Sequence, residues 1–158
     1  MEADTHAHFA LLSDLKIAIA DNQLELHYQP KLAMNGQVIG LEALLRWNHP
    51  ERGLLMPDAF IALAEQTGAV HEVTRYVIAA AIEQQVGWIA EGVRLPIAVN
   101  ISARDLQDES FPPFVASMLD DRGVDATALS VEITERALMD NLDATTQTLR
   151  ALQKIGIR

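Results

Sequence analysis

The chain has 158 residues, of which 49% are hydrophobic and 22% are charged, and this composition is typical of one globular domain rather than of a disordered tract. Its formal net charge is −10, which disfavours a surface for DNA or RNA polymers, and the absence of cysteine excludes disulfides, thiolate metal sites and cysteine nucleophiles. No signal peptide is visible and no apolar run reaches the roughly 20 residues that a membrane span requires, so we expect a cytoplasmic chain, whose longer parent could still be membrane-anchored.

The first third of the chain predicts a helix followed by a hairpin. Apolar residues at helical spacing predict a helix over residues 10–22. The segments LELHYQPKL and VIGLEALLRW then alternate, and Asn35-Gly36 between them predicts two antiparallel strands. We expect a loop over residues 48–57, because this segment contains two prolines and a glycine.

Helices and strands alternate in the rest of the sequence. Strands are predicted over residues 95–102 and 129–134, and helices over residues 57–68, 73–91, 111–123 and 141–156. This order predicts a parallel sheet with helical crossovers, and hence an α/β fold of the barrel or doubly wound type. An eight-stranded barrel needs about 250 residues, so the chain is expected to form only about half of one.

Three of the predicted strands each place a polar residue among apolar neighbours. Alternation puts Glu42, Leu44 and Arg46 on one face of their strand, opposite Leu41, Ala43, Leu45 and Trp47. The same pattern singles out Asn100 and Glu132 in the two later strands. If the apolar faces pack under helices, the polar residues meet on the inner face, near the carboxyl ends of their strands. Two carboxylates and an amide oxygen favour Mg²⁺, Mn²⁺ or Ca²⁺.

Alternatives to a metal site stay open at this stage. A polar strand residue commonly faces solvent, and Asn100 could simply cap a neighbouring loop. Glu132 and Glu135 could form the acidic first turn of a helix. His27 and His49 lack metal-ligand spacing, and phosphate-binding and serine-nucleophile motifs are absent from the sequence.

Four motifs taken together resemble a known family. In order and spacing, YQPKL, GLEALLRWNHPERGLLMPDAFIALAEQTG, AVNIS and VEITE resemble the first half of the EAL-domain cyclic di-GMP phosphodiesterases of bacteria. The resemblance implies a TIM-like barrel with an antiparallel first strand. It also implies hydrolysis of cyclic di-GMP, a bacterial second messenger, to linear pGpG with two Mg²⁺ or Mn²⁺ ions, and inhibition by Ca²⁺. Residues 1–22 are expected to be a connector helix, and residues 23–158 the N-terminal half of the domain.

The resemblance also implies roles for individual residues. It assigns metal binding to Glu42, Asn100 and Glu132, and substrate binding to Gln29, Leu44 and Arg46, the last as a phosphate clamp. Glu42 and Glu135 would be the catalytic carboxylates, with Glu135 holding the loop after its strand. The family pattern continues with a DDFGTG-type loop, a lysine, a glutamate and a glutamine that this chain does not contain. We therefore expect little or no hydrolysis by the chain alone.

Several interpretations remain at the level of the sequence. The main one is an active phosphodiesterase, and the alternative is a non-catalytic module that binds cyclic di-GMP or a protein partner. A different α/β metal hydrolase that shares only the geometry is a third. Expected partners are cyclic di-GMP, a second copy that closes the open sheet edges, and an upstream sensory or diguanylate cyclase domain in a longer parent. The sequence does not distinguish a fragment or split gene from a natural short protein.

Overall fold

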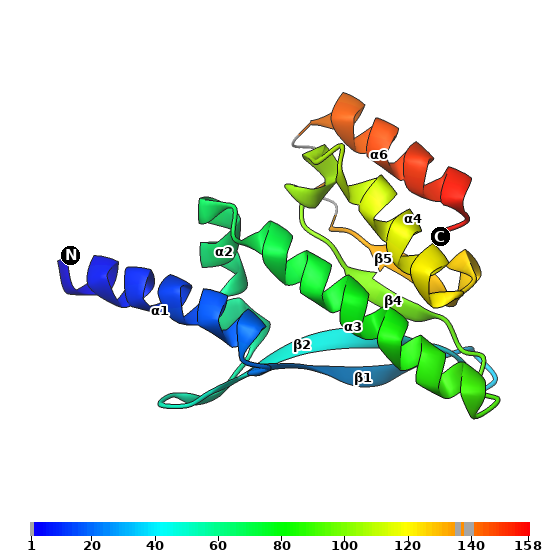
Figure 1. The fold of residues 1–158 in the computed structure, drawn as a ribbon, viewed down its shortest axis with the longest axis horizontal. Coiled ribbons are helices and arrows are strands. Elements are labelled where there is room, and N and C mark those ends of the chain that lie inside the picture. Colours follow the sequence, from blue (N-terminus) through cyan, green and yellow to red (C-terminus); the bar gives the residue numbers. More distant parts are fainter. Residues whose placement is uncertain (1, 135–136, 138–140) are drawn as a thin grey trace.

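The computed structural model describes residues 2–134, 137 and 141–158, which form one mixed sheet with helices packed on it (Figure 1). The five-stranded sheet has the order β1-β2-β4-β5, and β3 pairs with β2. The strands are β1 Leu24–Leu32, β2 Val38–His49, β3 Gly53–Leu55, β4 Ile97–Asn100 and β5 Leu129–Glu132. The helices are α1 Glu2–Ala20, α2 Ile61–Thr67, α3 Val70–Ala90, α4 Phe111–Arg122 and α6 Leu142–Ile155.

The predicted hairpin is confirmed. Strands β1 and β2 pair antiparallel over their length, from Leu24 opposite Trp47 to Leu32 opposite Val38. At the turn, Gly36 has φ +80°, a backbone conformation that glycine adopts without steric cost, and the Asn35 side chain accepts a hydrogen bond from the Gln37 N–H at 3.0 Å. Local turn chemistry therefore starts the hairpin, and a one-residue shift in register between Lys31 and Leu32 sets the pairing of the rest of the two strands.

The predicted parallel crossovers are also present. Strand β2 pairs parallel with β4, which in turn pairs parallel with β5, and the connections run through α3 and α4 respectively. The sheet is thus parallel except for β1 and the short β3. This is the expected α/β architecture with an antiparallel first strand, and it confirms the predicted fold class.

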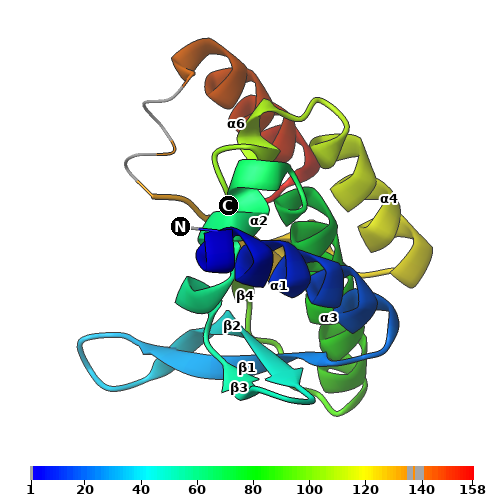
Figure 2. The ribbon, with the colours of Figure 1, turned by 90° about the vertical axis from the view of Figure 1, so that its left-hand side faces the viewer.

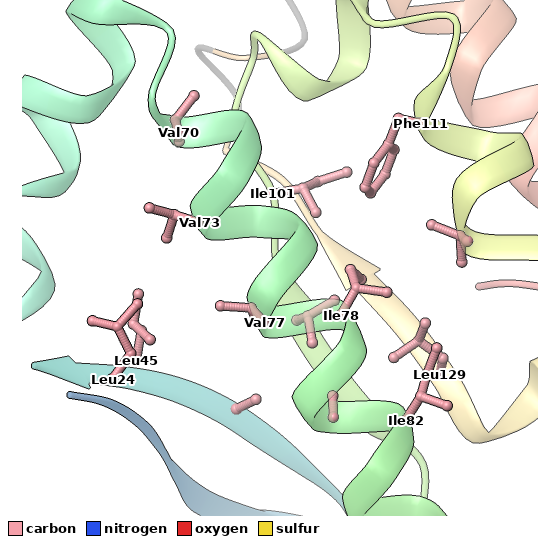
Figure 3. Packing of buried hydrophobic residues seen from close by; sticks show 14 of the residues in the cluster. Leu24, Leu45, Val70, Val73, Val77, Ile78, Ile82, Ile101, Phe111 and Leu129 are labelled. Atoms are coloured by element: carbon pink, nitrogen blue, oxygen red, sulfur yellow. The ribbon is translucent and has the colours of Figure 1, made fainter. Parts of the chain in front are cut away.

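The hydrophobic core lies between one face of the sheet and the helices. Figure 3 shows Val73, Val77 and Ile78 of α3 directed toward side chains from the strands and from α4. Ile78 and Ile82 are completely buried, and so is Trp47 of β2. Each such side chain contributes about 1.5–3 kcal/mol of burial free energy. The apolar face of the strands is therefore held under the helices, as the alternation predicted.

The loop prediction over residues 48–57 was wrong. Strand β2 continues to His49, and residues Gly53–Leu55 return as β3, with His49 opposite Gly53 and Trp47 opposite Leu55 (Figure 2). The prolines do not interrupt this pairing, because Pro50 lies in the turn and Pro57 begins the next element. The positive φ of Gly53, +71°, completes the turn. The sheet accordingly has one more strand than the sequence indicated.

Two helix boundaries also differ from the prediction. The helix expected over residues 57–68 is divided into a 3₁₀ turn, Pro57–Ala59, and α2. Phe60 between them leaves the helical conformation with φ −139°, and its ring is buried against Trp47 with a centroid distance of 5.3 Å. Burial of an aromatic ring thus outweighs continuity of the helix. Helix α1 begins at Glu2 rather than residue 10 and ends at Ala20.

Candidate functional site

Strand register brings the predicted polar residues to one face of the sheet. Across the parallel pairs, Glu42 lies opposite Ala98, and Asn100 lies opposite Glu132. Opposed residues project from the same face, and so do residues two apart on one strand. Glu42, Asn100 and Glu132 therefore share the face that points away from the core. Their common face was predicted and is confirmed.

Contacts between side chains connect these residues into a cluster. The Asn100 amide Nδ2 donates a hydrogen bond to Glu42 Oε1 at 2.9 Å. On the other side, Glu132 Oε1 accepts a hydrogen bond from the Lys31 ammonium, with which it forms an ion pair. The cluster thus contains two carboxylates, one amide and one ammonium. We define the polar cluster as Lys31, Glu42, Asn100 and Glu132.

The predicted position of Glu42 needs correction. Asn100 and Glu132 are the last residues of their strands, but Glu42 lies in the middle of β2 rather than near its carboxyl end. Its partner Ala98 precedes Asn100 by two residues, or about 7 Å along the strand. The contact is therefore diagonal, and the length of the glutamate side chain makes it possible.

The Lys31–Glu132 contact shows that the polar face is concave. In the strand order, β2 and β4 separate β1 from β5, so three interstrand spacings of about 4.8 Å would put Lys31 and Glu132 about 14 Å apart in a flat sheet. An extended lysine and glutamate with a hydrogen bond between them also span roughly 14 Å. Lys31 is, however, opposite Gly40, whereas Glu132 is opposite Asn100, two residues beyond the partner of Glu42, so the two are also offset by about four residues, or roughly 13 Å, along the strands. The sheet must curl toward its polar face for the two charges to meet. This curvature is what one wall of a barrel requires.

Arg46 lies on the same face, farther along β2. Its guanidinium is half-buried, and Nη1 donates to the Leu45 carbonyl oxygen at 2.8 Å. Its cross-strand partner on β1 is Glu25, whose pKa is lowered by a hydrogen bond from the His27 ring, with Nε2 2.8 Å from Oε1. The arginine is therefore flanked by an ionised carboxylate and bonded only to a neutral carbonyl among the contacts of the described residues.

The remaining predicted site residues are distributed as follows. Gln29 lies opposite Glu42 and is exposed, and Leu44 is half-buried on the same face, opposite His27. Both could contact a ligand that lies over the sheet. Glu135 lies outside the described residues, so its predicted role has no structural counterpart here.

The polar cluster fits part of the coordination sphere of a hard divalent cation. Glu42 and Glu132 supply carboxylate oxygens, and the Asn100 amide has an oxygen besides the nitrogen that bonds to Glu42. Mg²⁺ and Ca²⁺ take six or more oxygen ligands, so these residues supply about half of them. Within residues 2–134, 137 and 141–158, no group of three or more His, Cys, Asp or Glu residues could hold a metal. The Asn100 amide oxygen is the third oxygen donor of the polar cluster.

A network around Asp105 holds the turn that follows Asn100. The Asp105 side chain is 2% exposed, and its Oδ2 accepts hydrogen bonds from the Thr74 hydroxyl at 2.7 Å, the Ser102 N–H at 3.0 Å and the Ser102 hydroxyl at 2.8 Å. Its Oδ1 lies 2.9 Å from His71 Nδ1. Because Thr74 and His71 belong to α3, the network ties the end of β4 to that helix.

Sequence reasoning missed this network and the role of Lys31. Ser102 and Asp105 bond reciprocally, since the Asp105 N–H also donates to Ser102 Oγ at 3.2 Å, in the manner of a capping box. The spacing Ser-x-x-Asp was therefore a usable signal. Lys31 lies in the YQPKL motif, but contact with Glu132, 101 positions away, could not be read from spacing.

One histidine also differs from its predicted loop location. His49 is the last residue of β2, and its side chain is 3% exposed. Its Nδ1 accepts hydrogen bonds from the Glu51 and Arg52 N–H groups, which leaves Nε2 to donate to Asp14 Oδ2 at 3.2 Å. The His49 side chain therefore has a structural role, because its hydrogen bond to Asp14 links α1 to the end of β2.

The fold and the site together define the class of this protein. It is an α/β barrel wall with an antiparallel first strand and an oxygen-rich cluster on its concave face. The family model of the EAL domain matches residues 12–158, and the chain therefore belongs to the EAL domain family.

Relatives of known name support the family assignment. The chain is 36% identical over 91% of its length to the cyclic di-GMP phosphodiesterase PdeR of Escherichia coli, and covers 22% of that protein. It is 42% identical over 91% of its length to the cyclic di-GMP phosphodiesterase NbdA of Pseudomonas aeruginosa, and covers 19% of it. The chain thus spans about a fifth of the length of these relatives.

Solved structures confirm the fold. The PaMucR phosphodiesterase in complex with c-di-GMP superposes with a TM-score of 0.87 at 39% identity, covering 94% of this chain and 61% of that one. The EAL domain of Xanthomonas citri FimX in complex with c-diGMP gives a TM-score of 0.89 at 25% identity, covering 100% of this chain and 62% of that one. The chain corresponds to roughly three-fifths of these structures. Within the described residues, no helix has the length and apolar character to span a membrane.

Proposed function

We propose that the chain forms one wall of a site for the metal-dependent hydrolysis of cyclic di-GMP to linear pGpG. The observation that carries the proposal is the contact of Asn100 with Glu42 on a concave face that also presents Arg46 and Glu132. The chain belongs to a family in which proteins 36% and 42% identical to it are named cyclic di-GMP phosphodiesterases.

Glu42, Asn100 and Glu132 would hold Mg²⁺ or Mn²⁺ through oxygen atoms. The bound cation would polarise a phosphoryl oxygen and activate a water molecule, and Ca²⁺ would bind without supporting this chemistry. We retain Glu42 and Glu135 as the catalytic carboxylates, with Glu135 holding the loop after its strand. Because the three described donors fill only about half of a cation's coordination sphere, we propose little or no turnover by these 158 residues alone.

Arg46 would bind a phosphate of the substrate. A guanidinium can pair with two phosphate oxygens at once, and such a charged pair is stronger than its present bond to the neutral Leu45 carbonyl. Gln29 and Leu44 flank this position on the same face and would line the nucleotide. The cation and the arginine together would attract an anionic substrate to a chain whose net charge is −10.

The wider arrangement is part of the same proposal. We propose that residues 1–22 connect to an upstream sensory or diguanylate cyclase domain, which is supported by relatives about four to five times as long as this chain. Residues 23–158 would be the N-terminal half of the EAL domain, completed by further chain or by a second copy. A second messenger made inside the cell implies a cytoplasmic site of action, and no binding of DNA or RNA polymers is expected.

A second candidate function is binding of cyclic di-GMP without turnover. The observation that favours it is the same incomplete donor set, since a phosphate clamp on Arg46 does not depend on a full metal site. Such a chain would act as a sensor or as an interaction module.

Calorimetry with Ca²⁺ in place of Mg²⁺ tests ligand binding without turnover. Cyclic di-GMP is titrated into the chain, into Arg46→Ala, and into Arg150→Ala, whose arginine is exposed on α6. Removing a charge-assisted phosphate contact worth about 1.5–3 kcal/mol should weaken binding about 10- to 150-fold in Arg46→Ala and leave Arg150→Ala unchanged. A chain folded by circular dichroism that shows no saturable binding would refute the proposal. Formation of pGpG with Mn²⁺ then separates the phosphodiesterase from the sensor.

A further inference from the structure

We propose that Lys31 is an internal counter-ion of the candidate metal site, which holds Glu132 until a divalent cation displaces it. This inference rests on the proposed function of the polar cluster, and it concerns a residue to which neither the alternation pattern nor the family motifs assigned a role.

The position of Lys31 supports this role. It projects from β1 on the same face as Gln29 and Glu42, because Lys31 is opposite Gly40 and the next pair on that face joins Gln29 to Glu42. Its ammonium reaches across the concave face to Glu132 on β5. The other lysines, Lys16 and Lys154, lie on helices α1 and α6. Among the lysines, Lys31 is thus the one placed to neutralise part of the negative charge of Glu42 and Glu132.

The charges of the cluster explain why a counter-ion is needed. Asn100 bonds to Glu42 and lies opposite Glu132, so two carboxylates approach each other on either side of one amide. Like charges at short range destabilise the folded state, and the Lys31 ammonium reduces the cluster from −2 to −1. In the absence of a metal, the lysine therefore stabilises the arrangement of the ligands.

A divalent cation and the ammonium compete for the Glu132 carboxylate. The cation needs the Glu132 carboxylate that Lys31 occupies, and the two positive charges repel each other. The Lys31 side chain is 43% exposed and has a flexible four-carbon stem, so it can rotate into solvent when the metal binds. Metal binding thus breaks the Lys31–Glu132 ion pair, and the pair lowers the apparent metal affinity.

Two substitutions at position 31 change this competition in opposite directions. Lys31→Met keeps the apolar stem and removes the competing charge, so Mn²⁺ should bind about two- to fivefold more tightly, the range expected from a partly exposed ion pair. Lys31→Arg keeps the charge and can pair with both carboxylate oxygens, so Mn²⁺ should bind less tightly than to the original chain. Opposite changes in Mn²⁺ affinity in the two variants would show that the side chain at position 31 competes with the cation for Glu132, rather than acting only through the net charge of the chain.

The experiment measures free Mn²⁺ by electron paramagnetic resonance during titration of the 158-residue chain, without substrate or turnover. The variants are Lys31→Met, Lys31→Arg and the control Lys154→Met, which makes the same change in net charge on exposed α6. Circular dichroism checks that each is folded. The expected order of Mn²⁺ affinity is Lys31→Met first, then the original chain and Lys154→Met together, then Lys31→Arg.

Each other outcome is decisive. Equal affinities of Lys31→Met and Lys154→Met would overturn the inference, and so would tighter binding by Lys31→Arg than by the original chain. In either case the original chain still binds Mn²⁺, so the proposed metal site survives. If no folded variant binds Mn²⁺, both the metal site and the role of Lys31 are refuted.

Discussion

Replacement of Asp105 tests how the chain holds the end of β4, where Asn100 lies. The buried Asp105 carboxylate accepts hydrogen bonds from the Ser102 N–H, from two hydroxyl groups and from His71. Asp105→Ala removes the acceptor for all of them and leaves a cavity between α3 and the turn. Asp105→Asn keeps the shape and one carbonyl oxygen but removes the charge.

The structure allows the two effects to be estimated. Hydrogen bonds to a charged group contribute about 1.5–3 kcal/mol each, but loss of the carboxylate also removes its desolvation cost, so the sum is not additive. We expect Asp105→Ala to lower the free energy of unfolding by about 3–5 kcal/mol, as for other disrupted buried charges. In Asp105→Asn, the oxygen can keep the three bonds at Oδ2 while the amide donates to a His71 ring in the other tautomer. That change should cost about 1 kcal/mol.

Urea denaturation followed by circular dichroism measures both variants. For a chain of this size, 3–5 kcal/mol corresponds to a fall in Tm of about 10 °C, which thermal denaturation should show independently. The control is Asp120→Ala, at an exposed position of α4, where we expect a change within about 0.5 kcal/mol. A loss below about 1 kcal/mol in Asp105→Ala, or equal losses in the Ala and Asn variants, would refute the assigned role.

Two further predictions concern polar groups that are partly or fully buried. Burial, with a smaller contribution from Tyr76, raises the pKa of Tyr28 to about 12, and burial also raises the pKa of Tyr76. A pH titration followed by absorbance at 295 nm should therefore show both tyrosines ionising at higher pH in the folded chain than in urea. Because the pKa values are higher in the folded chain than in the unfolded chain, the neutral tyrosines stabilise the folded state fully below pH 10, and this stabilisation is lost as the pH rises toward 12. Tyrosines that titrate near pH 10 in the folded chain would contradict the prediction. Gln85 is 1% exposed, and its amide donates hydrogen bonds to the Leu95 and Ala128 carbonyls at 2.7 and 2.8 Å. Because Gln85→Leu leaves both carbonyls without this donor, it should lower the free energy of unfolding by about 2–4 kcal/mol, as measured by urea denaturation. A loss below about 1 kcal/mol would refute this estimate.

Features that depend on local chemistry and on side-chain alternation could be predicted from the sequence. The Asn35-Gly36 hairpin is one, because asparagine and glycine supply the backbone conformations of a tight turn, and Gly36 has φ +80°. The division of β2 into an apolar face with Trp47 and a polar face with Glu42 is another, because strand side chains alternate whatever their partners are. These patterns, with the motifs of the family, were enough to choose the fold class and the residues of the candidate site.

Other features were decided only when the strands came together. The short β3 exists because it pairs with the end of β2, and its own three residues carry too little signal. The diagonal contact of Asn100 with Glu42 depends on the relative register of β2 and β4, and the contact of Lys31 with Glu132 depends on the curvature of the sheet across four strands. Alternation determines which face a side chain occupies, but register and curvature determine which side chains meet there, and both arise from packing of the whole sheet against its helices.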